Sequence, residues 1–221
     1  MTPFFSGQNI SCIRSGNNVF SSKDFSLNKG ELLFVTGPNG SGKSSFLQIL
    51  SGLSTSNQGH LHWNGLKIKT PSQNHFQRLH YLGHDRALKD DLTPFETLCF
   101  WSNMPASMIS DTLELFGLNN HKYRPIKCLS HGQKQRLTLA RLHLSEKPLW
   151  ILDEPTTGLD EPSFHTFVNA LNIHLQKGGL AVIATHAPFQ VPFPTQVISM
   201  TGTIGKTLWW NYLFVLIFIK N

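Results

Sequence analysis

The chain has 221 residues, of which 40% are hydrophobic and only 14% are charged, and its formal net charge at pH 7 is +6. This length allows one α/β domain with a substantial core and excludes two ordinary catalytic domains. The low share of charge suggests a surface covered by a partner, and the basic residues are too scattered for a nucleic-acid arm, so a membrane surface is favoured over nucleic acid.

The N-terminal third predicts a small antiparallel sheet followed by a buried parallel strand. Gln8 to Arg14 and Phe20 to Leu27 have the alternation and the β-branched or aromatic content of strands. Glu31 to Thr36 is almost continuously apolar, as expected of a strand buried on both faces, and leads through a Gly-rich loop into a helix predicted from Lys43 to about Leu50. A strand from His60 to Trp63 then enters a tight hairpin turn.

The middle of the chain changes to a helical pattern between Thr93 and Leu142. Pro94 suits the first turn of a helix, Gly117 is a C-terminal stop, and Gly132 opens a further helical run. We interpret this stretch as a helical subdomain, spanning about residues 86–142, that is inserted into the core.

The core resumes with two more apolar strands and a helix between them. The strands are expected at Leu149 to Leu152 and at Leu180 to Thr185, and the helix from about Pro162 to Gln176. Helices that alternate with apolar strands predict a mostly parallel sheet. The expected fold is therefore α/β, with a mostly parallel core sheet (about 1–85 and 143–205), a small antiparallel β subdomain and the inserted helices, in a single domain over 1–205.

Residues 206–221 form an apolar and aromatic C-terminal tail, in which Leu208 to Ile219 is interrupted only by Asn211. The run is shorter than the roughly 20 residues that a membrane-spanning helix needs. We interpret it as a core element or a helix packed on a partner. An interfacial anchor, with Trp and Tyr at the level of the lipid headgroups, is the alternative.

The three cysteines, Cys12, Cys99 and Cys128, are far apart and form no Cys-x-x-Cys pair. This favours a reducing compartment and buried or inert thiols over a disulfide framework or a zinc site. The first ten residues have neither a basic and apolar signal sequence nor an Arg-rich presequence, so no targeting segment is expected there.

The Gly-rich loop after the first buried strand has the composition of a phosphate-binding loop. Glycines allow the chain to turn several backbone N–H groups toward the negative oxygens of a triphosphate at a helix N-terminus. Lys43 is expected to reach the β- and γ-phosphates, and the Ser44 hydroxyl to ligate Mg²⁺. The expected ATP-binding residues here are Gly37, Pro38, Asn39, Gly40, Ser41, Gly42, Lys43, Ser44 and Ser45.

Two adjacent carboxylates, Asp153 and Glu154, end the strand that begins at Leu149. The C-terminal ends of strands are where ligands bind in open α/β sheets. Asp153 is therefore expected to hold Mg²⁺, and Glu154 to act as the general base on the attacking water. Taken alone, the pair is also what a helix cap provides.

The segment Leu129 to Gln133 precedes a helix, so Ser130 is placed as its N-cap and the residues after it offer free N–H groups to an anion. Together with the phosphate loop, Asp153-Glu154, Gly158-Leu159-Asp160 and His186, this segment resembles the signature of the ABC ATPases. The resemblance covers nearly the whole chain up to about residue 200.

That resemblance implies a head-to-tail homodimer, in which Ser130, Gly132 and Gln133 of one subunit contact the ATP held by the loop of the other. It also implies that His186 contacts the γ-phosphate and Glu154, which makes Lys43, Glu154 and His186 the catalytic set, and that Asp160 communicates across the dimer.

The chain departs from the family pattern at three places. His131 replaces the first glycine of the signature, and His84 stands where most relatives have a glutamine that senses the γ-phosphate and the metal. An imidazole titrates near neutral pH, unlike an amide. The aromatic residue that usually stacks on adenine has no clear counterpart, although the planar guanidinium of Arg14 is a candidate.

Three short sequence segments narrow the resemblance to one family of ABC ATPases. Tyr81 to His84, Leu92 to Leu98 and Leu149 to Pro155 look like the ATP-binding subunits of the cytochrome c maturation, or haem exporter, complex, the CcmA family. The resemblance implies a peripheral subunit that drives separate integral membrane subunits in haem handling. It would lie on the cytoplasmic face of a bacterial inner membrane or the matrix face in mitochondria. The low charge and abundant Phe favour an organelle-encoded protein.

Several alternatives remain. A soluble ABC ATPase of iron-sulfur assembly, an importer or drug-exporter subunit, and a non-catalytic module that clamps its partner with ATP share these motifs. A DNA-repair ATPase is excluded, because its long coiled coil is missing. Direct haem binding is not expected: His60 and His62 lie on one face of a short strand, and there is no Cys-x-x-Cys-His motif.

Overall fold

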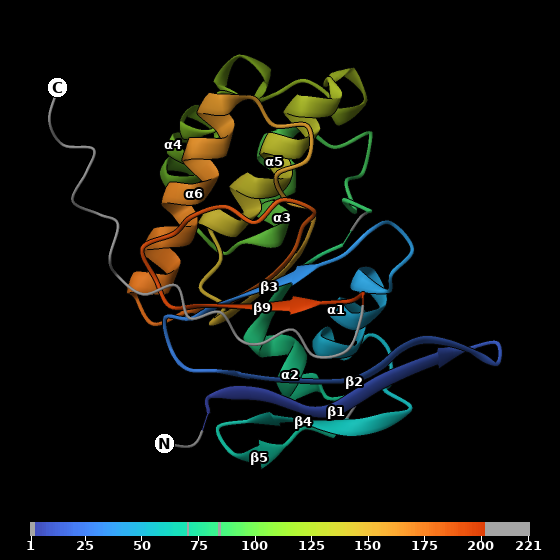
Figure 1. Cartoon of the computed structure of the whole chain (residues 1–221). Helices are drawn as coiled ribbons and strands as arrows, with labels where there is room; N and C mark the ends of the chain where they lie inside the picture. The colour runs from blue at the N-terminus through green and yellow to red at the C-terminus, as the bar shows by residue number, and fades with distance from the viewer. Residues whose placement is uncertain (1–2, 70, 84, 202–221) are drawn as a thin grey trace, which may run out of the picture.

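A parallel sheet forms the centre of the molecule in the computed structural model, which describes residues 3–69, 71–83 and 85–201 (Figure 1). Its five strands lie in the order β6-β7-β8-β3-β9, and every neighbouring pair is parallel. The strands are β3 (Leu32–Thr36), β6 (Leu79–Leu82), β7 (Leu149–Asp153), β8 (Leu180–Ala184) and β9 (Thr195–Ser199).

A second, antiparallel sheet lies below the first in Figure 1, with its strands in the order β2-β1-β4-β5. Its strands are β1 (Phe5–Arg14), β2 (Asn17–Leu27), β4 (Gln58–Trp63) and β5 (Leu66–Lys67). Asn64 and Gly65, between β4 and β5, both have positive φ, as a two-residue hairpin turn requires. The sequence prediction of a small antiparallel sheet is confirmed.

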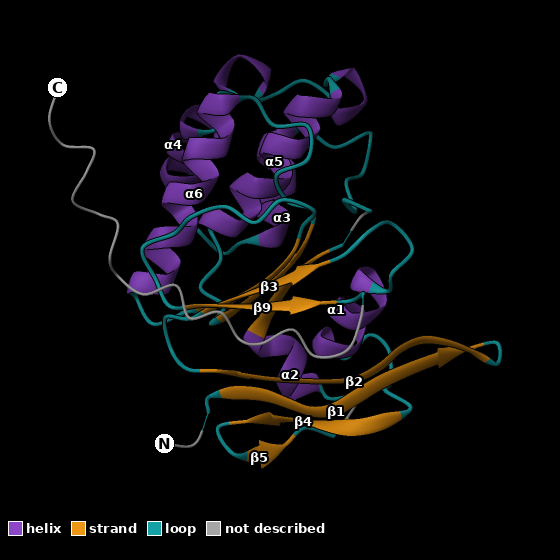
Figure 2. Ribbon diagram, in the orientation of Figure 1, coloured by secondary structure: helices purple, strands orange, loops and turns teal. Residues whose placement is uncertain are grey.

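The helices are divided between the two faces of the parallel sheet (Figure 2). Between the sheets lie α1 (Lys43–Ser51) and α2 (Gln73–Arg78). On the other face lie α3 (Pro94–Trp101), α4 (Ala106–Leu115), α5 (His131–His143) and α6 (Glu161–Gln176), with two 3₁₀ turns, η1 (Asn119–His121) and η2 (Ile126–Cys128). No helix among the residues described here is long and apolar enough to cross a membrane.

Alternate side chains of β3 pack into two separate cores. Leu32 and Phe34 join the cluster under α3 to α6, whereas Leu33 and Val35 join the cluster with α1 and the antiparallel sheet. The strand is buried on both faces, as its continuous apolar sequence predicts. The loops at its C-terminal end are thereby fixed between two layers, which positions the site described below.

Most predicted elements are confirmed, and their boundaries shift by a few residues. The sequence does not predict three elements. The strand β6 and the helix α2 are short, and the residues of β9 are only half-buried. Of the three thiols, which were expected to be buried or inert, Cys12 is buried, and Cys99 and Cys128 are exposed. The helix α3 turns Thr97 and Leu98 inward, so Cys99 points outward.

Two histidines of the core are held neutral by burial. Burial, and then the charges of Arg141 and Lys147, lower the pKa of His80 on β6 to about 4. Burial also lowers the pKa of His174 on α6 to about 4, even though its ring contacts the Leu180 carbonyl oxygen. The His174 ring is stacked on Trp150 at 4.0 Å between centroids.

We predict that these histidines destabilise the fold in mild acid. In the unfolded chain each takes up a proton below its ordinary pKa of 6.5, whereas in the folded chain each stays neutral down to about pH 4. The stability that the neutral histidines preserve is therefore fully present above pH 6.5 and is lost as the pH falls toward 4. Between pH 7 and pH 5 each histidine lowers the free energy of unfolding by about 2 kcal/mol.

Urea unfolding at pH 7 and pH 5 measures this loss. His80→Leu is expected to lose about 2 kcal/mol less than the wild type over that interval, because the proton-binding site is gone. The control is His165→Leu, at a side chain that is 70% exposed. An equal pH-dependent loss in His80→Leu and the control would contradict the prediction.

Candidate active site

The loop between β3 and α1 leaves the first turn of α1 open to an anion. The N-cap of α1 is Gly42, with φ of 95°, and no side chain of the described residues caps this helix end. The first backbone N–H groups of a helix have no partner within the helix, and together with the helix dipole they favour a negative ligand. The sequence Gly37 to Ser44 therefore folds locally as expected.

Gly42 also allows the loop to approach β2 closely. A Cβ atom at this position would lie 2.8 Å from Cγ1 of Val19 and 3.0 Å from Cδ1 of Phe20. Gly40 has a similar positive φ of 78°, but a Cβ atom there would meet nothing within 4 Å. The loop is thus packed on one side and open on the other.

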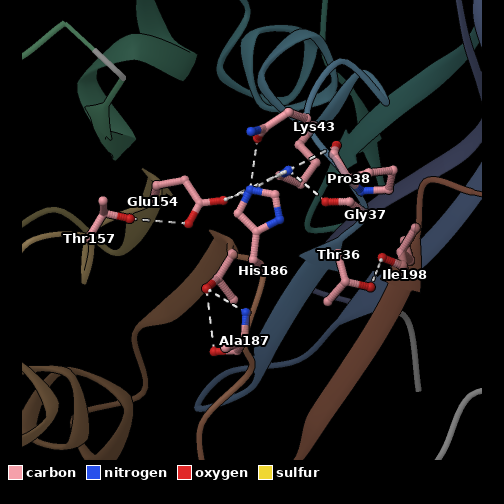
Figure 3. Close-up of polar contacts among 11 residues, drawn as sticks. Thr36, Gly37, Pro38, Lys43, Glu154, Thr157, His186, Ala187 and Ile198 are labelled. Carbon is pink, nitrogen blue, oxygen red and sulfur yellow. Dashed lines mark hydrogen bonds and ion pairs between the residues drawn. The ribbon is translucent and has the colours of Figure 1, made fainter.

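Lys43 lies folded back across its own loop (Figure 3). Its Nζ donates to the carbonyl oxygen of Gly37 at 2.7 Å and to that of Pro38 at 3.2 Å. The side chain is only 8% exposed. These bonds hold the ammonium group beside the open N-terminus of α1, where a cation adds to the attraction for an anion.

Glu154 faces Lys43 from the end of β7. Its Oε1 lies 3.8 Å from Nζ of Lys43, and its N–H donates to the carbonyl oxygen of Ala184 at 2.9 Å. Its φ of 48° is unusual for a residue other than glycine. Such strain is found most often at functional sites, where the surrounding structure holds it in place.

His186 follows β8 and completes the group in Figure 3. Its Nε2 lies 2.9 Å from Oδ1 of Asn39, 3.3 Å from Oε1 of Glu154 and 3.4 Å from Nζ of Lys43. Because the two oxygens can only accept, we assign the proton to Nε2. His186 then donates to Asn39, and its contact with Lys43 is not a hydrogen bond.

Three adjacent strands deliver these side chains to one edge of the sheet. Lys43 follows β3, His186 follows β8, and Glu154 follows β7, and these strands are neighbours in the order β7-β8-β3. All three are parallel, so their C-terminal ends meet at the same edge. This is the edge at which open α/β sheets bind ligands.

Asp153 is suited to hold a cation. It is 6% exposed, and its Oδ2 is buried with no hydrogen-bond partner among the described residues. A buried carboxylate oxygen without a partner is costly unless a cation or donor reaches it. Tyr81 lies nearby: burial, and then the charge of Asp153, raises the pKa of the Tyr81 hydroxyl.

The signature segment lies on the other side of the sheet, at the start of α5. Ser130 is the N-cap of α5: its Oγ accepts from the Gln133 N–H at 3.2 Å, and the Gln133 side chain accepts from the Ser130 N–H at 2.8 Å. The predicted cap is confirmed. Gln133 also contacts Nε2 of His121. A Cβ atom at Gly132 would lie 3.9 Å from the carbonyl oxygen of Gly158.

Asp160 caps the next helix. Its Oδ1 accepts from the Ser163 N–H at 3.0 Å, at the start of α6. The hydrogen bonds from Ser163, first from its side chain and then from its backbone, lower the pKa of this exposed carboxyl group.

The structure thus brings together one part of the predicted site and leaves another part apart. Lys43, Glu154, His186 and the loop residues Gly37, Pro38 and Asn39 are in contact. Ser130 and Gln133 contact each other, Gln133 contacts His121, and Gly132 lies beside Gly158 in the loop after β7. Ser44 and Ser45 lie in the first turn of α1. His84 and the tail 206–221 lie outside the described residues.

Sequence reasoning missed several contacts of this site. Asn39 was expected to bind ATP, but its bond to His186 joins residues 147 positions apart, and no local pattern reports it. Thr157 Oγ1 lies 3.5 Å from Oε2 of Glu154. Arg14 donates to Oε1 of Gln48 on α1 at 2.9 Å, which places this candidate for adenine stacking next to the helix that carries the loop.

Comparison with known proteins identifies the family. Residues 20–157 match the model of the ABC transporter family. The chain is 42% identical over 195 residues to the cytochrome c biogenesis ATP-binding export protein CcmA of Paramagnetospirillum magneticum, covering 85% of this chain and 90% of the relative. It is 41% identical to CcmA of Nitrosomonas europaea, covering 81% and 86%. The chain belongs to the CcmA family of ABC ATP-binding proteins.

Solved structures agree with this family. An ATP-binding subunit of an ABC transporter superposes with a TM-score of 0.74 at 25% identity, over 83% of this chain and 79% of the other. An ATP-binding cassette described as a dimer in a post-hydrolysis state with ADP and Pi has a TM-score of 0.71 at 20% identity, over 83% and 88%, and shares the fold. The chain is an ABC-type ATPase, and its α/β fold class is confirmed.

We predict that Gly42→Ala destabilises the protein more than Gly40→Ala. Both substitutions place a side chain at positive φ, which costs about 1 kcal/mol. Only Gly42→Ala also forces a Cβ atom against Val19, which adds about 1–3 kcal/mol. Urea unfolding of both variants measures the difference. Equal losses in the free energy of unfolding would show that Gly42 is not closely packed against β2.

Proposed function

We propose that this chain hydrolyses ATP to drive a membrane complex of cytochrome c biogenesis that handles haem. The observation that carries the catalytic part is the convergence of Lys43, His186 and Glu154 at the ends of three adjacent strands, within 3.8 Å of one another. The relatives named above, which are export proteins of cytochrome c biogenesis, support the pathway.

The phosphates of ATP would bind across the N-terminus of α1. Backbone N–H groups of the loop and of Gly42 to Ser45 would donate to the phosphate oxygens, and Lys43 would exchange its carbonyl partners for the β- and γ-phosphates. Because Lys43 and Glu154 are 3.8 Å apart, a γ-phosphate bound by Lys43 would lie beside the carboxylate.

Hydrolysis requires a base for the attacking water, and Glu154 is in position to act as one. The water oxygen would form a bond to the γ-phosphorus while its proton passes to Glu154, and the bond from the γ-phosphorus to the bridging oxygen would break to release ADP and phosphate. His186 carries its proton on Nε2 and would donate to the γ-phosphate from this position.

Mg²⁺ fits this edge of the site. The Oδ2 atom of Asp153, buried and without a partner among the described residues, would hold the metal, and the exposed Ser44 hydroxyl at the start of α1 is the second ligand that the family pattern implies. When bound, the ion would offset the charge of the β- and γ-phosphates.

The site also requires a second copy of the chain. Ser130 and Gln133 cap each other at the start of α5, and the N–H groups of His131 and Gly132 in this first helical turn favour an anion. We infer that two chains associate head to tail, so that this segment contacts the ATP bound to the loop of the other chain. A cassette of the same fold is described as a dimer.

The hydrolysing dimer would act on integral membrane subunits as a peripheral protein. The relatives compared are bacterial, which supports the cytoplasmic face of a bacterial inner membrane and gives no support to the mitochondrial alternative expected from composition. The alternative of iron-sulfur assembly likewise gains no support from these relatives. The haem itself would be handled by the membrane subunits.

Glu154→Gln tests the catalytic assignment. The amide keeps the size of the side chain but cannot accept the proton from water, so kcat is expected to fall by about 100-fold or more while ATP binding remains. The control is Glu161→Gln, a carboxylate that is 87% exposed and seven residues along the chain. Steady-state phosphate release measures both, and a rate in Glu154→Gln close to that of the control would overturn the assignment.

The same pair of variants tests the pathway. In a bacterium that lacks its own CcmA, the wild-type chain and Glu161→Gln are expected to restore c-type cytochromes, measured by haem staining, and Glu154→Gln is expected not to. Restoration of iron-sulfur enzyme activity without c-type cytochromes would favour the alternative instead.

A further inference from the structure

Arg86 connects the signature segment to the catalytic turn within one chain. Its NH2 group lies 2.7 Å from Nε2 of His131, the first residue of α5. Its Nε donates to Oε1 of Gln135 at 2.8 Å, one turn further along the same helix. One guanidinium therefore holds two side chains of α5 at once, which its planar fork of donors allows and a lysine does not.

Gln135 carries the connection to the nucleotide-binding edge. This side chain is only 5% exposed, and its Nε2 donates to the carbonyl oxygen of Pro155 at 2.7 Å. Pro155 follows the strained residue Glu154 directly. A continuous chain of hydrogen bonds thus runs from His131 through Arg86 and Gln135 to the turn that carries the catalytic carboxylate.

Arg86 itself is fixed from a third side. Arg141, which is 5% exposed, donates from NH1 to the carbonyl oxygen of Arg86 at 3.1 Å. The guanidinium of Arg141 lies 3.8 Å over the ring of Trp101 on α3, and burial lowers its pKa to about 10. The group remains a cation at neutral pH, so its backbone bond to Arg86 is charge-assisted.

The bond between Arg86 and His131 also fixes the imidazole. A guanidinium can only donate, so Nε2 of His131 must accept, and in the neutral ring the proton is then on Nδ1. The contact between NH1 of Arg86 and Nδ1, at 3.4 Å, is then not a hydrogen bond, because both nitrogens carry protons. A Cβ atom at Gly158 would lie 3.6 Å from the His131 ring, so the ring is also beside the loop before Asp160.

We propose that Arg86 is a positioning residue that locks the start of α5 to the Glu154 turn. The inference rests on the proposed function, because α5 presents Ser130 to the ATP of a second chain while Glu154 acts on the ATP of its own chain. Arg86 therefore couples the two ATP sites of the dimer, and the replacement of the usual signature glycine by His131 provides the side chain that makes the coupling possible.

The experiment measures ATP binding and hydrolysis in Arg86→Gln and Arg86→Lys of the full-length chain. Both variants are expected to keep the ATP dissociation constant within about twofold, because among the described residues Arg86 bonds to α5 and not to the phosphate loop. Both are expected to lower kcat by about tenfold or more, since small misplacements of catalytic groups have effects of this size, and to lower the Hill coefficient for ATP toward 1. The control is Arg124→Gln, an exposed cation of the same helical layer.

Two outcomes would overturn the proposal. Rescue of kcat by Arg86→Lys would show that charge alone matters and that the two-pronged contact does not. Weaker ATP binding in proportion to the loss of activity would show a role at the phosphate loop instead.

A double-mutant cycle with His131→Gly separates positioning from a general effect on folding. In the His131→Gly background the loss of kcat caused by Arg86→Gln is expected to shrink by about fivefold, since residues in contact are coupled. Equal losses in both backgrounds would contradict the proposal. Glu154→Gln is assayed beside these variants. If Glu154→Gln is inactive but the losses of kcat at Arg86 and His131 are independent, only the role of Arg86 is wrong. If Glu154→Gln is active, the proposed function is wrong.

Discussion

The close approach of Lys43 and Glu154, 3.8 Å apart, depends on the order of the strands in the parallel sheet. Lys43 and Glu154 follow β3 and β7, and β8 lies between these strands and ends next to His186. A buried ammonium and a strained carboxylate would each be costly alone. Their mutual attraction, the carbonyl oxygens that accept from Lys43 and the Asn39 side chain beside His186 offset that cost. The same charges, arranged around the open N-terminus of α1, suit a triphosphate.

The two faces of the sheet have different tasks. The face with α1 carries the phosphate loop, and the face with α3 to α6 carries the signature segment at the start of α5. Side chains of β3 alternate between these two cores, so neither layer can shift without disturbing the strand that leads into the loop. The bonds of Arg86 and Gln135 are one direct polar connection from the signature helix to the end of β7. In the proposed dimer, this connection would link the two ATP sites.

Sequence reasoning succeeds where the determinants are local. The buried strand, the Gly-rich loop and the helix from Lys43 follow one another in the chain, and the N-cap Ser130 is recognised from the residues beside it. The partners of Lys43 and Arg86 cannot be found in this way. His186 lies 143 residues from Lys43, and His131 lies 45 residues from Arg86, so only the order of strands and the packing of α5 bring them together. Strand β9 is missed because its half-buried residues lack an apolar pattern.

The central claim is that each ATP is held between two copies of the chain. Light scattering of Glu154→Gln with saturating ATP and Mg²⁺ tests it most directly, because a chain that binds ATP without hydrolysing it should accumulate as the closed dimer. We expect a particle with twice the mass of one chain, and a single-chain mass when Ser130→Arg is added to block the signature segment. A single-chain mass for Glu154→Gln with ATP bound, or a dimer that persists with Ser130→Arg, would contradict it.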